Sequence, residues 1–142
     1  MGLLRAEIEL IRTADLFAFD EGMIKRKQIR RMKVQTLVDT GALTLVINET
    51  VRTQLKLKTL EQRTATLADG SVFEADVVGP VDIRFENRET TVRAIVVPGD
   101  AECLLGAIPI EDMDLVGNLN EQKLTVNPDH PIKAQMTLKG MR

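Results

Sequence analysis

The sequence contains few of the residues that mark disulfide-rich or metal-binding proteins. It has one cysteine, one histidine, no tryptophan and no tyrosine. A single thiol, Cys103, cannot form an internal disulfide, which fits a protein of the reducing cytoplasm. The single imidazole, His130, stands between Asp129 and Pro131 without the further ligands of a typical metal site. We therefore expect no metal, and interpret Cys103 as a small buried thiol and His130 as part of a surface loop.

Net charge and long hydrophobic runs are also missing. The 19 basic and 21 acidic residues leave a net charge of −2, so no global positive field favours non-specific nucleic-acid binding. No apolar run approaches the roughly 20 residues that a membrane-spanning helix needs. The first residues mix Arg5, Glu7 and Glu9 with apolar residues, unlike the core of a signal peptide. We predict a soluble, cytoplasmic, single-domain protein that binds neither nucleic acid nor a membrane.

One stretch of the chain is locally basic. Residues 25–33 hold six basic side chains with no aromatic residue among them. Such a run is more often a solvated face than a nucleic-acid site. Residues 14–24, just before it, show no sustained period of either kind. Together the two segments predict a loop or a short helical connection.

The rest of the sequence is dominated by short β-like segments. Residues 6–11 alternate apolar and polar side chains with a period near two, as a strand with one face on the core does. The further segments with strand character are 34–38, 43–47, 64–67, 71–78, 81–85, 90–97 and 123–126. The turn signals Asp69-Gly70, Gly79-Pro80 and Glu86-Asn87 separate several of them, and Asp69-Gly70 predicts a two-residue hairpin turn within residues 64–77.

Two short helices are predicted between these strands. Asn48 is a good N-cap and Glu49 follows it in the first turn, so a helix of about two turns should begin there. Pro109 fits the first turn of a second helix within residues 108–115. Because no strand-helix-strand unit repeats, the fold class is all-β, closed into a barrel-like form, with one or two short helices.

A candidate catalytic residue lies where the segment 34–38 ends. Val38 is followed by Asp39, Thr40, Gly41 and Ala42. This triplet alone is weak, because Asp, Thr and Gly also make ordinary turns. Its context is stronger, since apolar strands flank it and the apolar-apolar-Gly element 104–106 follows much later.

These segments together resemble the retropepsin-like aspartic proteases, especially the small prokaryotic members. The resemblance is carried, in order, by VDTGA, TATLADGSVFEA, TTVRAIVVPG, LLGAIPIEDMDL and KLTVNP, and it covers roughly residues 34–128. In that family an Asp-Thr/Ser-Gly loop is followed by a flap hairpin and then by a hydrophobic-hydrophobic-Gly segment. The resemblance implies the closed retropepsin fold and an aspartic endopeptidase.

Residue roles follow from the same resemblance. Asp39 is implied as the catalytic carboxylate, with Thr40, Gly41 and Ala42 supporting the active-site loop. The flap tip is implied at Ala68, Asp69, Gly70, Ser71 and Val72, and the structural support segment at Leu104, Leu105 and Gly106. Two aspartates that share one proton activate a water in this family, which requires neither metal nor cofactor. Asp39 is the single aspartate in such a triplet, so we expect a homodimer in which each subunit supplies one carboxylate to a peptide or protein substrate.

The resemblance also divides the chain and leaves one alternative function. We expect a protease domain at residues 34–128 and a C-terminal tail at residues 129–142 that frays from residue 136. Residues 1–33 form an N-terminal extension, either a pro-segment or, as we favour, an added strand with a basic connection. The alternative is a non-catalytic peptide-binding or assembly module that retains the protease fold. Substrate specificity does not follow from the sequence.

Overall fold

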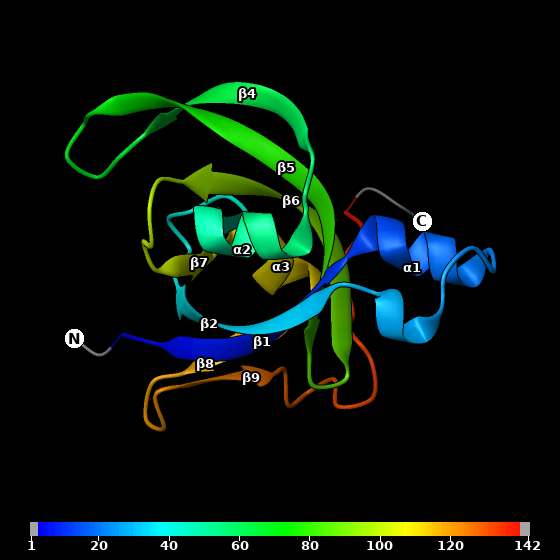
Figure 1. Cartoon of the computed structure of the whole chain (residues 1–142). Helices are drawn as coiled ribbons and strands as arrows, with labels where there is room; N and C mark the ends of the chain where they lie inside the picture. Colours follow the sequence, from blue (N-terminus) through cyan, green and yellow to red (C-terminus); the bar gives the residue numbers. More distant parts are fainter. Residues whose placement is uncertain (1–2, 140–142) are drawn as a thin grey trace.

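The computed structural model describes residues 3–139 and shows a small β-barrel with short helices around it (Figure 1). Its strands are β1 (Arg5–Arg12), β2 (Arg31–Val38), β3 (Leu45–Asn48), β4 (Thr59–Thr66), β5 (Val72–Phe85), β6 (Arg88–Val97), β7 (Cys103–Leu105), β8 (Leu115–Asn118) and β9 (Lys123–Val126). Its helices are α1 (Thr13–Asp20), α2 (Glu49–Leu55) and α3 (Ala107–Asp112), with a 3-10 helix, η1 (Arg26–Gln28). None of the helices within residues 3–139 is long and apolar enough to cross a membrane.

Six of the strands close the barrel. They are hydrogen-bonded in the order β5-β6-β3-β7-β2-β1, and β1 pairs back onto β5 with Leu10 opposite Ile83. Outside this ring, β4 extends β5 on one side and the hairpin β8–β9 joins β1 on the other. The predicted all-β, barrel-like class is confirmed, and residues 5–12 form the strand expected at residues 6–11.

The barrel interior is filled by alternating apolar side chains. Strand β1 places Ile8 and Leu10 inside, and Leu45, Ile83 and Leu105 meet them from other strands; each is at most 1% exposed. Removing such side chains from water is the main favourable term in folding, about 1.5–3 kcal/mol for each fully buried residue. In β1, the apolar residues of the period-two pattern therefore point into one core.

The predicted helix at Asn48 is confirmed, and the segment predicted as a loop or short helical connection contains a further helix, α1. The Asn48 side chain accepts a hydrogen bond from the Val51 N–H at 2.9 Å and so caps α2. The described residues form three α-helices rather than one or two, because Thr13–Asp20 is also helical. This helix has almost no amphipathic character, which is why the periodicity of residues 14–24 did not reveal it.

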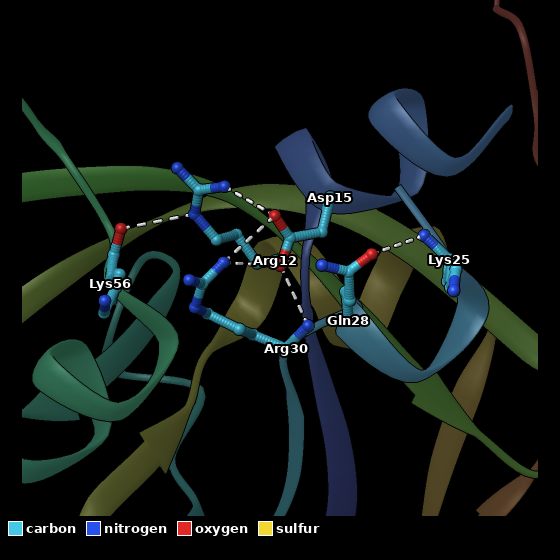
Figure 2. A network of polar contacts seen from close by, with 6 residues as sticks. All are labelled: Arg12, Asp15, Lys25, Gln28, Arg30 and Lys56. Atoms are coloured by element: carbon cyan, nitrogen blue, oxygen red, sulfur yellow. Dashed lines mark hydrogen bonds and ion pairs between the residues drawn. The ribbon is translucent and has the colours of Figure 1, made fainter. Parts of the chain in front are cut away.

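Tertiary polar contacts hold α1 instead. Asp15, whose side chain is 6% exposed, accepts a hydrogen bond from Arg12 Nη1 at 2.7 Å and from the Arg30 N–H at 2.8 Å (Figure 2). Arg12 also donates through Nε to the Lys56 carbonyl at the end of α2. Burial alone raises the pKa of Asp15, but these hydrogen bonds outweigh it and the pKa is lowered overall. The network ties residues 12–30 to the barrel and to α2.

Two further predictions about the strands are wrong. Gly79-Pro80 is not a turn between strands, because β5 runs through it as one strand with a bulge between Val78 and Val81 and a cis peptide bond before the proline. Gly79 has a φ of +128°, which only glycine adopts readily. Residues 115–118, partly assigned to a helix, form strand β8 and pair with β9.

The segment after β9 is bound to the barrel. His130 lies in a surface segment, as predicted, but its Nδ1 lies 2.5 Å from Asp114 Oδ2 and its carbonyl accepts a hydrogen bond from buried Arg88. The His130 and Gln135 contacts lower the pKa of Asp114 to about 2. Residues 136–139 are exposed, and the remainder of the predicted frayed segment, residues 140–142, lies outside the described residues.

Candidate active site

Asp39 begins the loop that joins β2 to β3. Strand β7 lies between these two strands. It runs parallel to β2 and antiparallel to β3, and its Leu105 lies opposite Val38 on one side and Leu45 on the other. The loop therefore crosses over the end of β7, and the Asp39 N–H donates to the Leu105 carbonyl at 3.0 Å. The strand pairing fixes where the Asp39 backbone lies.

The loop also orients the Asp39 carboxylate. Gly41 N–H donates to Asp39 Oδ1 at 2.9 Å, and Ala42 N–H donates to the Asp39 carbonyl at 3.0 Å. A Cβ atom at Gly41 would lie 3.1 Å from that carboxylate oxygen, so glycine lets the loop fold closely around it. Thr40 is exposed beside Asp39, and Ala42 is half-buried.

Gly106 packs directly against the backbone of this loop. The Ala107 N–H donates to the Ala42 carbonyl and the Ile108 N–H to the Leu43 carbonyl, each at 2.9 Å. A Cβ atom at Gly106 would lie 2.3 Å from the Thr44 carbonyl oxygen and 2.6 Å from that of Ala42. Only a residue without a side chain fits this backbone contact. The segment 104–106 thus lies against the Asp39 loop.

The predicted flap residues form the tip of the β4–β5 hairpin, which arches away from the barrel (Figure 1). The predicted two-residue turn is wrong. Leu67 N–H bonds to the Ser71 carbonyl and Gly70 N–H bonds to the Leu67 carbonyl, with Gly70 at a φ of +86°, so the connection has three residues and a bulge at the glycine. Asp69 is a turn residue, because Ser71 donates to its carboxylate from both Oγ and N–H, and these bonds lower its pKa.

A cleft of about 980 Å³ lies between the Asp39 loop and this hairpin. Its lining includes the outward-facing residues of β6, namely Thr91, Arg93, Ile95 and Val97, and the hairpin residues Leu67 and Phe73. Val46 of β3 lies opposite Ile95 in the same sheet and also faces the cleft. The lining of the cleft is largely apolar, as is typical of ligand-binding clefts.

Three charged residues of the described chain line this cleft: Asp39, Arg63 and Arg93. The two arginines were not identified from the sequence. Arg93 alternates with buried neighbours on β6, which indicates an outward face, whereas β4 has no buried residue and gives no such signal for Arg63. The cleft itself depends on how the hairpin bends over the barrel. Asp39 is therefore the one carboxylate among the described lining residues.

Cys103 has no direct place in this site. It lies on β7 with 4% of its surface exposed, and burial raises the pKa of its thiol. A raised pKa disfavours the nucleophilic thiolate. The prediction of a small buried thiol is confirmed.

Comparisons with known proteins concern the family and the fold. The sequence model of the gag-polyprotein putative aspartyl protease family matches residues 26–108. The retroviral protease-like domain of Ddi1 from Leishmania major superposes with a TM-score of 0.52 at 10% identity, over 89% of this chain and 91% of that one. A retropepsin-like aspartic protease from Rickettsia conorii gives 0.41 at 16% identity (75% and 80% covered), and EIAV protease with the inhibitor HBY-793 gives 0.37 at 25% identity (52% and 70% covered).

No curated protein sequence matches the chain. The family model spans more than half of it, and the fold is shared with the protease-like domain of Ddi1. The closed barrel with short helices matches the predicted retropepsin-like fold. The chain belongs to the gag-polyprotein aspartyl protease family.

Proposed function

We propose that the protein is an aspartic endopeptidase in which Asp39 supplies one of two catalytic carboxylates. The observation that carries the proposal is the position of Asp39, at a cleft that fits an extended peptide, in a loop fixed by Leu105 and Gly106. Residues 34–128 would form the catalytic domain.

The second carboxylate would come from another copy of the chain. Aspartic peptidase chemistry uses two aspartates, whereas Asp39 is the one carboxylate among the described residues of the cleft. Leu43 of this loop is 64% exposed and Ile108 of α3 is 46% exposed, and the two are joined by a backbone hydrogen bond. A second subunit related by a two-fold axis beside Asp39 would cover these apolar side chains and bring the two Asp39 carboxylates together.

The paired carboxylates would share one proton, because two negative charges a few ångströms apart repel each other. The ionised aspartate takes a proton from a water as that water attacks the scissile carbonyl carbon. The protonated aspartate donates a hydrogen bond to the carbonyl oxygen and stabilises its developing negative charge. The tetrahedral intermediate then collapses and its C–N bond breaks. The aspartate that took the proton from water passes it to the nitrogen of the leaving amine.

The hairpin tip would act as a flap over the bound peptide. Residues 68–72 are all exposed and joined to the barrel through two long strands, so the tip can move without breaking the core. Closure would exclude water from the site and hold the peptide against β6.

A peptide-library cleavage assay with a pepstatin-type inhibitor tests this proposal. We expect Asp39→Asn to abolish cleavage while leaving the fold intact, because the side chain keeps its shape and loses its ionisable group. Asp20→Asn is the matched control, since that carboxylate is exposed at the end of α1 and does not line the cleft. Peptide binding without any cleavage by the unmodified protein would instead support a non-catalytic binding or assembly module.

A further inference from the structure

We propose that Arg93, together with Arg63, makes the cleft select peptides that carry an acidic side chain. This inference rests on the proposed function, because it names the substrate class of the same cleft. It is carried by the placement of the two guanidinium groups and by the uneven distribution of charge on the β4–β5 hairpin.

Arg93 is linked to the Asp39 loop through one backbone contact. It lies on the outward face of β6, between buried Val92 and Ala94. The Thr44 hydroxyl, from the end of the Asp39 loop, donates to the Arg93 carbonyl at 2.9 Å. The Arg93 side chain is 55% exposed, and it lines the cleft two residues along β6 from Ile95. A peptide lying along β6 would therefore pass this guanidinium group.

Arg63 brings a second positive charge to the same region from β4. The carboxylate of Glu61 contacts both arginines, through Arg63 Nε and, at 3.5 Å, through Arg93 Nη1. One negative charge thus faces two positive charges, so the group has a net charge of +1. Glu61 lies on the same face of β4 as Arg63, opposite the cleft-lining residue Val77, so its carboxylate offsets one of the two positive charges at this wall of the cleft.

The remaining acidic residues of the hairpin arms make their contacts elsewhere. Glu74 accepts a hydrogen bond from Thr64, and Asp76 accepts one from Gln62 and pairs with Arg52 of α2 at 3.3 Å. Neither residue lines the cleft. Arg63, Arg93 and Glu61 therefore leave this wall of the cleft with a net positive charge, although the chain as a whole carries a net charge of −2.

A positive charge in an otherwise apolar cleft favours a carboxylate. Guanidinium groups bind carboxylates through two parallel hydrogen bonds, and their charge repels Lys or Arg in the peptide. Because both arginines are more than half exposed, solvent weakens the effect. We expect a preference of about three- to fivefold in kcat/KM for one acidic residue over alanine at the matching peptide position.

Cleavage of peptides that differ at one position tests the inference. Each position along a cleaved peptide is set in turn to Glu, Ala or Lys, and the ratio of kcat/KM values is measured at low salt. We expect one peptide position at which kcat/KM decreases from Glu to Ala to Lys. Arg93→Gln should remove this preference, Arg93→Lys should keep part of it, and Arg93→Glu should reverse it, so that the ratio of kcat/KM for Glu over Lys changes about tenfold in total. Arg84→Glu is the matched control, because Arg84 is an exposed arginine of β5 that does not line this cleft.

The outcomes separate this inference from the proposed function. If peptides are cleaved at rates that ignore charge at every position, or if Arg93→Glu slows all peptides equally, the selectivity is refuted and the protease remains. If no peptide is cleaved, the proposed function fails. Binding of the same three peptides then decides the selectivity: an Arg93-dependent preference for the Glu peptide supports it, and equal binding overturns it.

Discussion

Replacing Gly106 by alanine tests how the support segment holds the Asp39 loop. The added methyl group would lie 2.3 Å from the Thr44 carbonyl oxygen and 2.6 Å from that of Ala42, both of them backbone atoms. Backbone cannot rotate away as a side-chain tip can. The loop must therefore move off β7, which strains the hydrogen bonds that Ala107 and Ile108 donate to it.

The size of the effect follows from two terms. Forcing a methyl group into packed structure costs about 1–3 kcal/mol, and weakening two backbone hydrogen bonds adds about 0.5–1.5 kcal/mol each. We expect Gly106→Ala to lower the free energy of unfolding by about 3–5 kcal/mol. With a urea m-value of about 2 kcal/mol/M, the midpoint falls by about 2 M. Far-UV circular dichroism is the suitable probe, because the chain has no tryptophan or tyrosine.

Gly117→Ala is the matched control for this substitution. A Cβ atom there would meet only Leu4 Cδ1, at 2.7 Å, and the end of a leucine side chain can turn aside. We expect its midpoint to fall much less, by about 0.5 M or under. Equal midpoints for the two variants would refute the claim that backbone contact at Gly106 fixes the loop.

Two further predictions concern polar contacts away from the cleft. Asp15→Ala should lower the free energy of unfolding by about 3 kcal/mol in urea titrations, because it leaves the arginines around a nearly buried carboxylate without their partner, whereas loss of under 1 kcal/mol would contradict the network in Figure 2. The pKa of Asp114 is lowered from 3.8, the ordinary value of an aspartate, to about 2. Its contact with His130 therefore stabilises the fold fully at a pH above 3.8, and this stabilisation is lost as the pH falls towards 2. Hydrogen exchange should show residues 127–135 opening over that range, and His130→Gln should shift the opening to higher pH; an unchanged profile would contradict the contact.

Much of the barrel could be predicted because its signals are local. The period-two pattern of residues 6–11 and the cap at Asn48 depend on neighbours in the sequence. The segment of α1 was predicted as a loop or a short helical connection, and its periodicity could not decide between the two, because one partner of Asp15 is Arg30, 15 residues along the chain. Gly79-Pro80 was misread for a related reason: the local turn signal is real, but pairing with β6 on both sides carries β5 through it.

The candidate site was predictable only in part. Asp39 and the segment 104–106 were found because their order along the chain matches a family pattern. Arg63 and Arg93 belong to no such pattern. Their meeting at Glu61 depends on the register of β4, β5 and β6 and on the bend of the hairpin, which residue spacing does not specify.

Mixing active and inactive subunits tests most directly whether two copies share one catalytic site. Asp39→Asn protein is mixed with unmodified protein in equal amounts, the subunits are allowed to exchange, and cleavage is measured at constant total concentration. If each site needs an Asp39 from both subunits, random pairing leaves about one quarter of the activity of the unmodified protein. Retention of about one half would mean that each chain acts alone and would contradict the shared carboxylate pair.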